Sequence, residues 1–303
     1  MKKDKFIADF EDIPSPRQKM PHLSLEERKL NFKEVELGFT EEIALKETSR
    51  CLSCRRCIGC GLCLAECDQQ AIVYDQKESF VTLEVDSIVV ATGAESFDAR
   101  RKPELGYSYY PNVITSIELE RILNANGPFG GILMRPSDGN IPQRIAFIQC
   151  VGSRDEDLGL NYCSNICCET ALKQAMVMMD RVDGLEITVF FSDMRPFSNH
   201  GESTYLKARG EYGIQFLPAK VNRITENPDT NCLQIQYSAR GQDMTLEFDL
   251  VVLSTGMVAT TGTRRLSRLF GFKPNKFGFF PTLPQMPVAN SSDQVWLAGA
   301  ITQ

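Results

Sequence analysis

The sequence predicts an α/β fold built on a parallel sheet. The segment from Arg144 to Asp193 shows the patterns of a strand, a helix and a second strand, an order typical of parallel sheets. Two buried-strand patterns, DSIVVATG (86–93) and DLVVLSTG (249–256), repeat each other and end in Thr-Gly, and QVWLAGA (294–300) is a third relative. The 303 residues, 43% of them hydrophobic, suffice for one large or two ordinary domains.

Composition and charge exclude several classes of protein. The net charge is −6 and Lys and Arg do not cluster, which argues against a nucleic-acid partner. No apolar run approaches the ~20 residues that cross a bilayer, and residues 1–10 lack the apolar core of a secretion signal. We therefore expect a cytoplasmic protein. With only His22 and His200, neither a zinc site rich in imidazoles nor catalysis by histidine is expected.

Residues 1–50 are polar and charged and predict a helical arm. Ser24 and Glu27 have the spacing of a capping box, and a second helix start lies near Thr40, before EEIALKETSR. The arm holds too few apolar residues for a core of its own.

The next segment, 51–78, carries a ferredoxin-like cysteine pattern. The spacing C-x2-C-x2-C-x3-C lets one tight loop place thiolates on a 4Fe-4S cube, and it is formed by Cys57, Cys60, Cys63 and Cys67. Asp68 stands where two-cluster ferredoxins have proline, which leaves the fourth ligand less defined. Cys51 and Cys54 extend the rhythm and could shift the register or share a second cluster. A zinc knuckle held by four thiolates is the alternative.

The remaining elements follow the same α/β order. In the predicted helix CCETALKQAMVMMD (167–180), the side chains of Leu172, Met176 and Met179 share one face and are expected to pack on the sheet. GIQFLPAKVNRI, CLQIQYS and MTLEFD, between 213 and 249, predict a meander with a turn at 239–242. This combination recurs in flavoproteins with two dinucleotide-binding domains.

A second cysteine group occupies a turn of the kind that binds dinucleotides. Cys150 ends a predicted strand, and Cys163, Cys167 and Cys168 gather at the start of the next helix, where amides and the helix dipole favour negative charge. Four thiolates complete a 4Fe-4S cube. Of a glycine fingerprint for NAD only Gly152 remains. A redox dithiol, such as Cys163 with Cys167, and inert buried thiols stay open as alternatives.

Several motifs together resemble the A-type subunit of heterodisulfide reductase. They are FIQCVGSRD, YCSNICC, RPSDG, VVATGAESFDA and VWLAGA, and the resemblance covers residues 50–303. The arm from Leu25 to Cys54 separately resembles the entry to the small subunit of glutamate synthase. RPSDG (135–139) also fits an ordinary turn, and the isolated Cys232 is expected to be a buried structural thiol.

The resemblance implies a thioredoxin-reductase-like core in which FAD and 4Fe-4S clusters pass electrons to partner subunits. In that family the second cysteine group ligates a cluster, and the segments bordering flavin correspond here to Ala91, Thr92, Gly93, Gly299 and Ala300. The partners implied are redox subunits of the heterodisulfide reductase B and C types or of the hydrogenase or formate dehydrogenase type, with a homodimer possible.

The expected division is an arm (1–50), a ferredoxin-like segment (51–78), an incomplete FAD-type domain (79–140 and 257–303) and an NAD-domain-like βαβ unit modified for a cluster (141–256). No glycine fingerprint for the ADP half of FAD occurs, so the chain is expected to be a fragment or the product of a split gene. The predicted function is electron transfer without a catalytic acid or base. The alternatives are an NAD(P)H-dependent FAD and iron-sulfur reductase, and a redox-inactive docking module with zinc or free thiols.

Overall fold

The computed structural model describes residues 17–29, 31, 33–49, 67–73, 77–239, 241–281 and 294–302. The chain divides into two compact units, Met1–Ser79 and Phe80–Gln303, and each is described by itself.

The described part of the first unit contains the two predicted helices, α1 (Leu25–Arg28) and α2 (Glu41–Ser49). The capping box of α1 is formed as predicted: the Glu27 amide donates to Ser24 Oγ at 3.3 Å, and the Ser24 amide donates to Glu27 Oε2 at 2.9 Å. No residue of α1 is buried, in keeping with an arm that lacks a core. Cys51, Cys54, Cys57, Cys60 and Cys63 lie outside the described residues.

The second unit is built on a five-stranded parallel sheet, which confirms the predicted α/β class. The strand order is β3 (Val113–Thr115), β10 (Leu250–Thr255), β4 (Arg144–Val151), β5 (Glu186–Phe191) and β6 (Gln215–Pro218). Every residue of β10 is buried, as expected for a central strand covered on both faces. Strand β3 is an edge strand of this sheet, although its residues lie in the segment that we expected to belong to the FAD-type domain.

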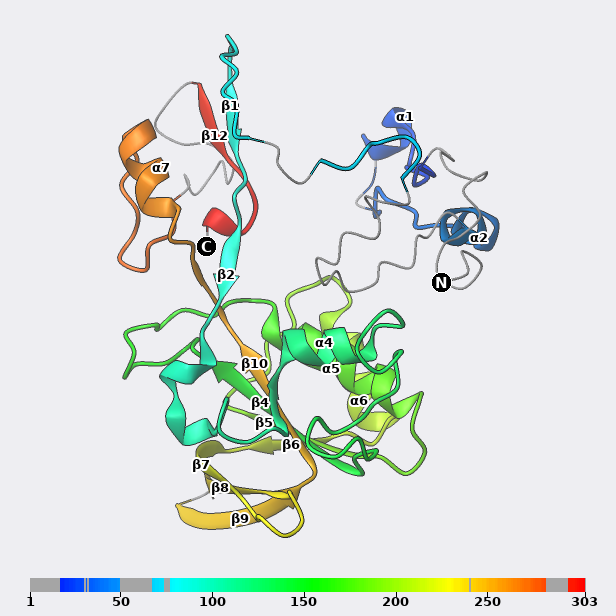
Figure 1. The fold of residues 1–303 in the computed structure, drawn as a ribbon, viewed down its shortest axis with the longest axis vertical. Coiled ribbons are helices and arrows are strands. Elements are labelled where there is room, and N and C mark those ends of the chain that lie inside the picture. The colour runs from blue at the N-terminus through cyan, green and yellow to red at the C-terminus, as the bar shows by residue number, and fades with distance from the viewer. Residues whose placement is uncertain are drawn as a thin grey trace. The chain divides into compact units, whose positions relative to one another are not determined.

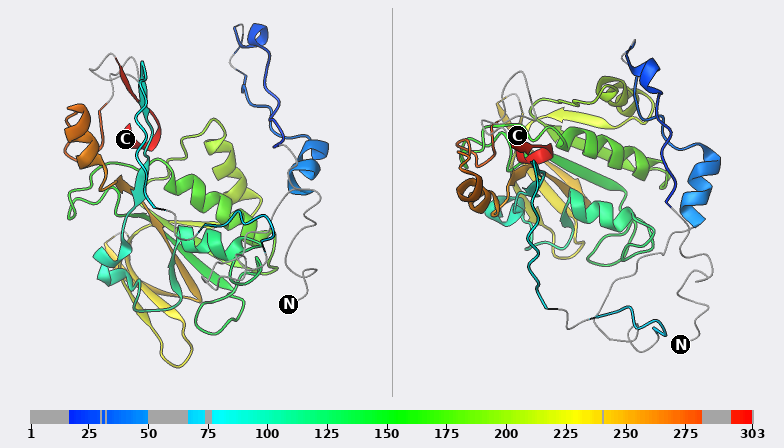
Figure 2. Two further views of the ribbon diagram at one scale, coloured as in Figure 1. Left: turned by 45° about the horizontal axis from the view of Figure 1, so that its top comes forward. Right: turned by 90° about the horizontal axis from the view of Figure 1, so that it is seen from above.

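Helices cover one face of the sheet and a small antiparallel sheet covers the other (Figure 1). The helices are α4 (Ser116–Leu123), α5 (Cys167–Met179) and α6 (Gly201–Gly210). Leu172, predicted to face the sheet, is fully buried in this layer, and Met176 and Met179 pack against it half-buried. The views of Figure 2 show the three helices on the same side of the strands.

The opposite face is covered by the meander β7 (Lys220–Glu226), β8 (Leu233–Ala239) and β9 (Gln242–Phe248). The predicted meander is wrong in one respect: residues 215–218 form β6, a parallel neighbour of β5, and do not join the antiparallel strands. Pro218 ends β6, and the Ala219 amide donates to the Phe191 carbonyl as the chain crosses to the other face. Proline is tolerated there because β6 is an edge strand.

Two short strand pairs remain. Each joins a segment that precedes the main sheet in the sequence to a segment that follows it. β1 (Ile88–Val90) pairs in parallel with β12 (Val295–Leu297), and β2 (Ala94–Ser96) pairs antiparallel with β11 (Met257–Ala259). Val90 and Leu297 share a separate small core with side chains near α7 (Thr263–Phe270). Short 3-10 turns complete the unit: η3 (Ala99–Arg101), η4 (Pro103–Leu105) and η5 (Gly299–Thr302). Within the described residues, no helix has both the length and the apolar character needed to cross a membrane.

Candidate metal centre

The four cysteines of the second group meet at the carboxyl ends of the parallel strands. Cys150 lies near the end of β4, Cys163 lies in the loop that follows, and Cys167 and Cys168 are the first two residues of α5. The topology explains the meeting, because the carboxyl end of a parallel strand and the start of the helix after it lie at the same edge of the sheet.

A β-bulge sets the direction of Cys150. The pairing of β4 with β10 shifts between Leu253, which is opposite Ile148, and Thr255, which is opposite Val151, so β4 holds one extra residue. Cys150 itself has a left-handed backbone, with φ +63°. A bulge of this kind bends a strand and redirects a side chain. The strand therefore ends with the Cys150 thiol turned out of the regular alternation.

Hydrogen bonds within the loop hold Cys163 close to β4. Ser153 Oγ donates to the Tyr162 carbonyl at 2.9 Å and accepts from the Ser164 amide at 3.1 Å. The Met257 amide donates to Ser164 Oγ at 2.8 Å. A Cβ on Gly256 would lie 2.6 Å from Ser153 Cβ, so the Thr-Gly end of β10 admits a close backbone approach, as the repeat pattern predicted.

Three of the four sulfur atoms have backbone partners. The Asn165 amide donates to Cys163 Sγ at 3.5 Å, and the Arg195 amide donates to Cys168 Sγ at 3.4 Å. The Cys167 thiol donates to the Thr255 carbonyl at 3.5 Å. Amides that point at sulfur suit a thiolate ligand, since the sulfur of a metal-bound cysteine is an acceptor only.

Burial and neighbouring cysteines make the thiols of Cys150, Cys167 and Cys168 poor acids. Burial above all, together with the neighbouring cysteines, raises the pKa of Cys150 to about 11 and that of Cys167 to about 12. The pKa of Cys168 is also raised, mainly by burial. Reactive dithiols have lowered pKa values, so this environment disfavours the dithiol alternative. A metal would instead displace the protons and stabilise the thiolates.

Two arginines add positive charge at the site. Arg154 lowers the pKa of both Cys150 and Cys168, partly offsetting burial. The pKa of Arg195 is raised, mainly by its hydrogen bond to Asp193 and to a lesser degree by Cys163 and Cys150. Sequence reasoning missed both cations. Arg154 could have been found, because it lies within CVGSRD, four residues after Cys150. Nothing in the sequence near Arg195 indicates that it lies close to the thiols.

The spacing of these side chains bears on the kind of metal centre that they could hold. Within the described ranges, no three His, Cys, Asp or Glu side chains are spaced to close on one metal ion. A cubane differs, because its four thiolates bind four different irons and therefore stand further apart than the ligands of one zinc. Four free thiols that are electrostatic neighbours, with amides directed at sulfur and two cations beside them, fit a cubane.

The turn after β4 does not fit a dinucleotide. Gly152 has φ +72°, and a Cβ placed there would lie 2.0 Å from Cγ of Phe97. The aromatic ring occupies the space where a nucleotide would approach the glycine of a fingerprint. The packing of Phe97 against the backbone therefore explains why position 152 is glycine.

The predicted flavin segments lie at one edge of the small sheet. Ala91, Thr92 and Gly93 directly follow β1, and Gly299 and Ala300 follow β12, its parallel partner. The Ala298 amide donates to the Val90 carbonyl at 3.0 Å, which aligns the two ends. Gly93 and Gly299 both have φ +72°, and no atom lies within 4 Å of a Cβ on either. Left-handed backbone explains both glycines.

The structure describes two further cysteines, Cys67 and Cys232. Cys67 belongs to the first unit, and its Sγ accepts from the Ala71 amide at 3.4 Å. Cys232 was predicted to be buried, which is wrong: it is half-buried, and its Sγ lies 3.6 Å from Asp249 Oδ1. It directly precedes β8, and its Sγ also lies 3.7 Å from the Thr230 carbonyl oxygen.

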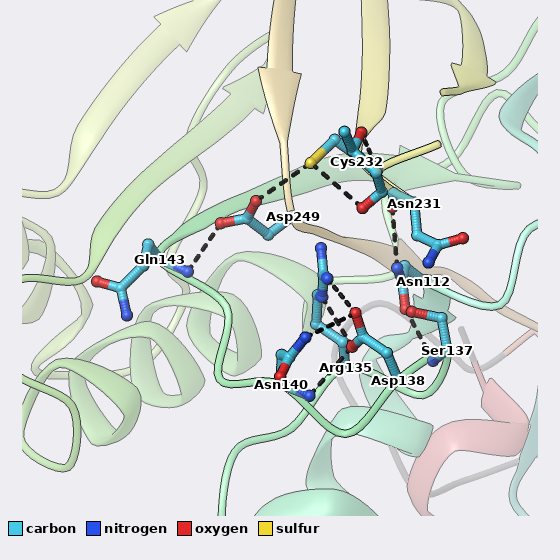
Figure 3. Close-up of polar contacts among 10 residues, drawn as sticks. Asn112, Arg135, Ser137, Asp138, Asn140, Gln143, Asn231, Cys232 and Asp249 are labelled. Atoms are coloured by element: carbon cyan, nitrogen blue, oxygen red, sulfur yellow. Dashed lines mark hydrogen bonds and ion pairs between the residues drawn. The ribbon is translucent and has the colours of Figure 1, made fainter. Parts of the chain in front are cut away.

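RPSDG forms a structural turn at the opposite, amino ends of the strands (Figure 3). The Arg135 guanidinium pairs with Asp138, and the Asn140 amide donates to Asp138 Oδ1 at 3.0 Å. The fully buried Asn112 accepts from the Ser137 amide at 3.1 Å and donates to the Asn231 carbonyl at 3.0 Å. This network explains the motif as an ordinary turn that anchors the sheet.

Comparison with known proteins gives close relatives. No family model matches the chain. The A-type subunit of H(2):CoB-CoM heterodisulfide,ferredoxin reductase from Methanothermobacter thermautotrophicus is 39% identical over 246 residues, covering 80% of this chain and 37% of that protein. The A-type iron-sulfur subunit of CoB–CoM heterodisulfide reductase from Methanocaldococcus jannaschii is 39% identical over 271 residues, covering 88% of this chain and 41% of that protein.

Solved structures similar to this chain include thioredoxin reductase from T. acidophilum, with a TM-score of 0.45 and 15% identity over 72% of this chain and 58% of that one. Thioredoxin reductase from Lactococcus lactis gives a TM-score of 0.45 and 14% identity over the same shares. The chain spans about two fifths of the length of the curated relatives above. Over 80 to 88% of its own length, the chain is homologous to a segment of the A-type subunit of heterodisulfide reductase.

Proposed function

We propose that this chain is an electron-transfer segment of a heterodisulfide-reductase-like complex. In this proposal Cys150, Cys163, Cys167 and Cys168 hold one 4Fe-4S cluster, and Cys57, Cys60, Cys63 and Cys67 hold another. The observation that carries the proposal is the convergence of four free thiols at one end of a parallel sheet, with backbone amides directed at two of them. The relatives are named as reductases, one of them as an iron-sulfur subunit.

A bound cluster would supply one-electron transfer. The chain's own residues would set its surroundings. Burial of Cys167 and Cys168 excludes water from one side of the site, whereas the half-buried Cys150 and Cys163 leave the other side nearer to solvent. Arg154 and Arg195, which both pair with Asp193, would offset part of the negative charge of four thiolates. No side chain is needed as a general acid or base.

FAD would lie at the edge formed by Ala91, Thr92, Gly93, Gly299 and Ala300, in this chain or completed by a partner. Support comes from the alignment of these residues at the carboxyl ends of two parallel strands. Such an edge is where α/β proteins bind nucleotides. The partners in this proposal are other redox subunits, which would donate or accept the electrons.

The test is metal analysis of the anaerobically purified and reconstituted chain. We expect broad absorbance at roughly 400 nm and about eight irons, four per cube. Cys150→Ser, Cys163→Ser and Cys167→Ser should each lower the iron content by up to half. Cys232→Ser is the matched control, because Cys232 is also a free, half-buried thiol but lies near the amino ends of the strands. It should leave the iron content unchanged.

Three outcomes would contradict the proposal. Zinc in place of iron would favour a docking module. Iron content insensitive to all three cysteine substitutions would place the cluster elsewhere. Oxidation of NAD(P)H by the isolated chain, retained in the cysteine variants, would favour a complete reductase and conflict with the packing of Phe97 on Gly152.

A further inference from the structure

Two polar side chains next to the second cysteine group are buried without a hydrogen-bond partner. Within the described residues, neither the amide Nε2 and Oε1 of Gln149 nor the hydroxyl of Ser254 has a partner. Gln149 is 8% exposed and Ser254 is 2% exposed. Buried polar groups in folded proteins nearly always find partners, so three unpaired atoms in neighbouring strands require an explanation.

Strand alternation places both side chains on the face covered by α5. Along β4, Gln149 follows Ile145 and Phe147 at every second position, and these two pack beneath the helices. Along β10, Ser254 follows Leu250 and Val252 in the same way.

The bulge brings the two side chains together. Because β4 holds one extra residue between Ile148 and Val151, Gln149 and Cys150 lie opposite Ser254 across the strand pair. The residue after Ser254 is Thr255, whose carbonyl accepts from Cys167. Each unpaired side chain thus directly precedes a residue that belongs to the cysteine site.

We propose that Gln149 Nε2 and Ser254 Oγ donate hydrogen bonds to sulfur atoms of the bound cluster and thereby raise its reduction potential. This inference rests on the proposed function, since it requires a cluster on Cys150, Cys163, Cys167 and Cys168. The amide nitrogen faces the sulfur atoms, because the amide oxygen would be repelled by their negative charge. The reduced cluster carries one more negative charge than the oxidised cluster, so each donor stabilises the reduced form more.

The test measures the midpoint potential of the reconstituted full chain by redox titration followed by EPR. Gln149→Leu removes the amide at similar size, and Ser254→Ala removes one oxygen atom. Each variant should shift the reduction equilibrium about tenfold toward the oxidised cluster. For a one-electron couple this lowers the midpoint potential by about 59 mV. Iron content should stay at the wild-type value, because no ligand is changed.

The chain offers matched controls for both variants. Ser137 Oγ is also buried and unpaired, but Ser137 lies in the turn at the amino ends of the strands. Gln174 is a buried amide on α5 whose Nε2 donates to the Ser116 carbonyl at 2.8 Å. Ser137→Ala and Gln174→Leu should leave the midpoint unchanged, which separates an effect on the cluster from a general effect on folding.

The outcomes distinguish this inference from the proposed function. If the wild-type chain binds no iron, or if Cys150→Ser, Cys163→Ser and Cys167→Ser all leave the iron content unchanged, the proposed function fails. If iron is bound through the cysteines but Gln149→Leu and Ser254→Ala both keep the wild-type midpoint, only this inference fails, and a buried water would explain the unpaired atoms. Should Gln149→Leu not fold, Ser254→Ala decides, since it deletes only an unpaired oxygen.

Discussion

The contact between Gly152 and Phe97 can be tested by adding one methyl group. In Gly152→Ala the new Cβ would lie 2.0 Å from Phe97 Cγ, and the backbone would keep φ +72°. Left-handed backbone costs a residue with a Cβ about 1–2 kcal/mol. Overpacking against the ring costs about 1–3 kcal/mol more. The expected loss of stability is therefore roughly 2–5 kcal/mol.

Gly139→Ala is the matched control, because Gly139 has φ +74° and no atom lies within 4 Å of a Cβ there. It should cost only the backbone contribution of about 1–2 kcal/mol. The assay is thermal unfolding of both variants followed by circular dichroism. Each kcal/mol should lower the midpoint by about 2–4 °C in a domain of this size. In a Phe97→Ala background the extra cost at Gly152 should largely disappear, because the ring is gone.

Equal costs at Gly152 and Gly139 would refute the reasoning. The ring would then not cover the glycine, and a nucleotide would be free to approach the turn after β4.

Three further predictions concern the amino ends of the strands and one helix. Asn112→Ala should destabilise the fold by about 2–4 kcal/mol in urea unfolding, because it removes two hydrogen bonds and leaves the Asn231 carbonyl unpaired. Thr115→Ala should cost about 1 kcal/mol by the same measurement, because it breaks the capping box of α4. The pKa of Asp138 is lowered from 3.8 to about 2, chiefly by its hydrogen bond from Arg135. The ionised Asp138 carboxylate therefore stabilises the folded state above pH ~4, and this stabilisation is lost as the pH falls toward 2. Asp138→Asn should therefore be less stable than wild type at pH 6, with the difference shrinking in acid unfolding profiles.

Elements with a strong local pattern could be predicted from the sequence. The strands β4, β5 and β10 and the helix α5 lie where the periodicity placed them, because buried strands and amphipathic helices have distinct repeats. The convergence of the four cysteines could also be predicted, since parallel topology fixes which strand and helix ends share an edge. The capping box of α1 could also be predicted, because it depends on only two residues that are three positions apart.

Features that depend on long-range packing could not be predicted. The pattern of residues 215–218 is the same for a parallel edge strand and for a meander strand, so only the neighbour decides. The bulge at Cys150 has no local signal, because cysteine has no preference for left-handed backbone. Phe97 and Gly152 are far apart in the sequence, and nothing in either segment indicates their contact.

The hydrogen-bond network around Asn112 and Arg135 shares no residue with the thiols at the other end of the strands. Inherited substitutions in that network should therefore change how much protein a cell accumulates, through turnover of unfolded chains, while each surviving molecule keeps its normal electron chemistry.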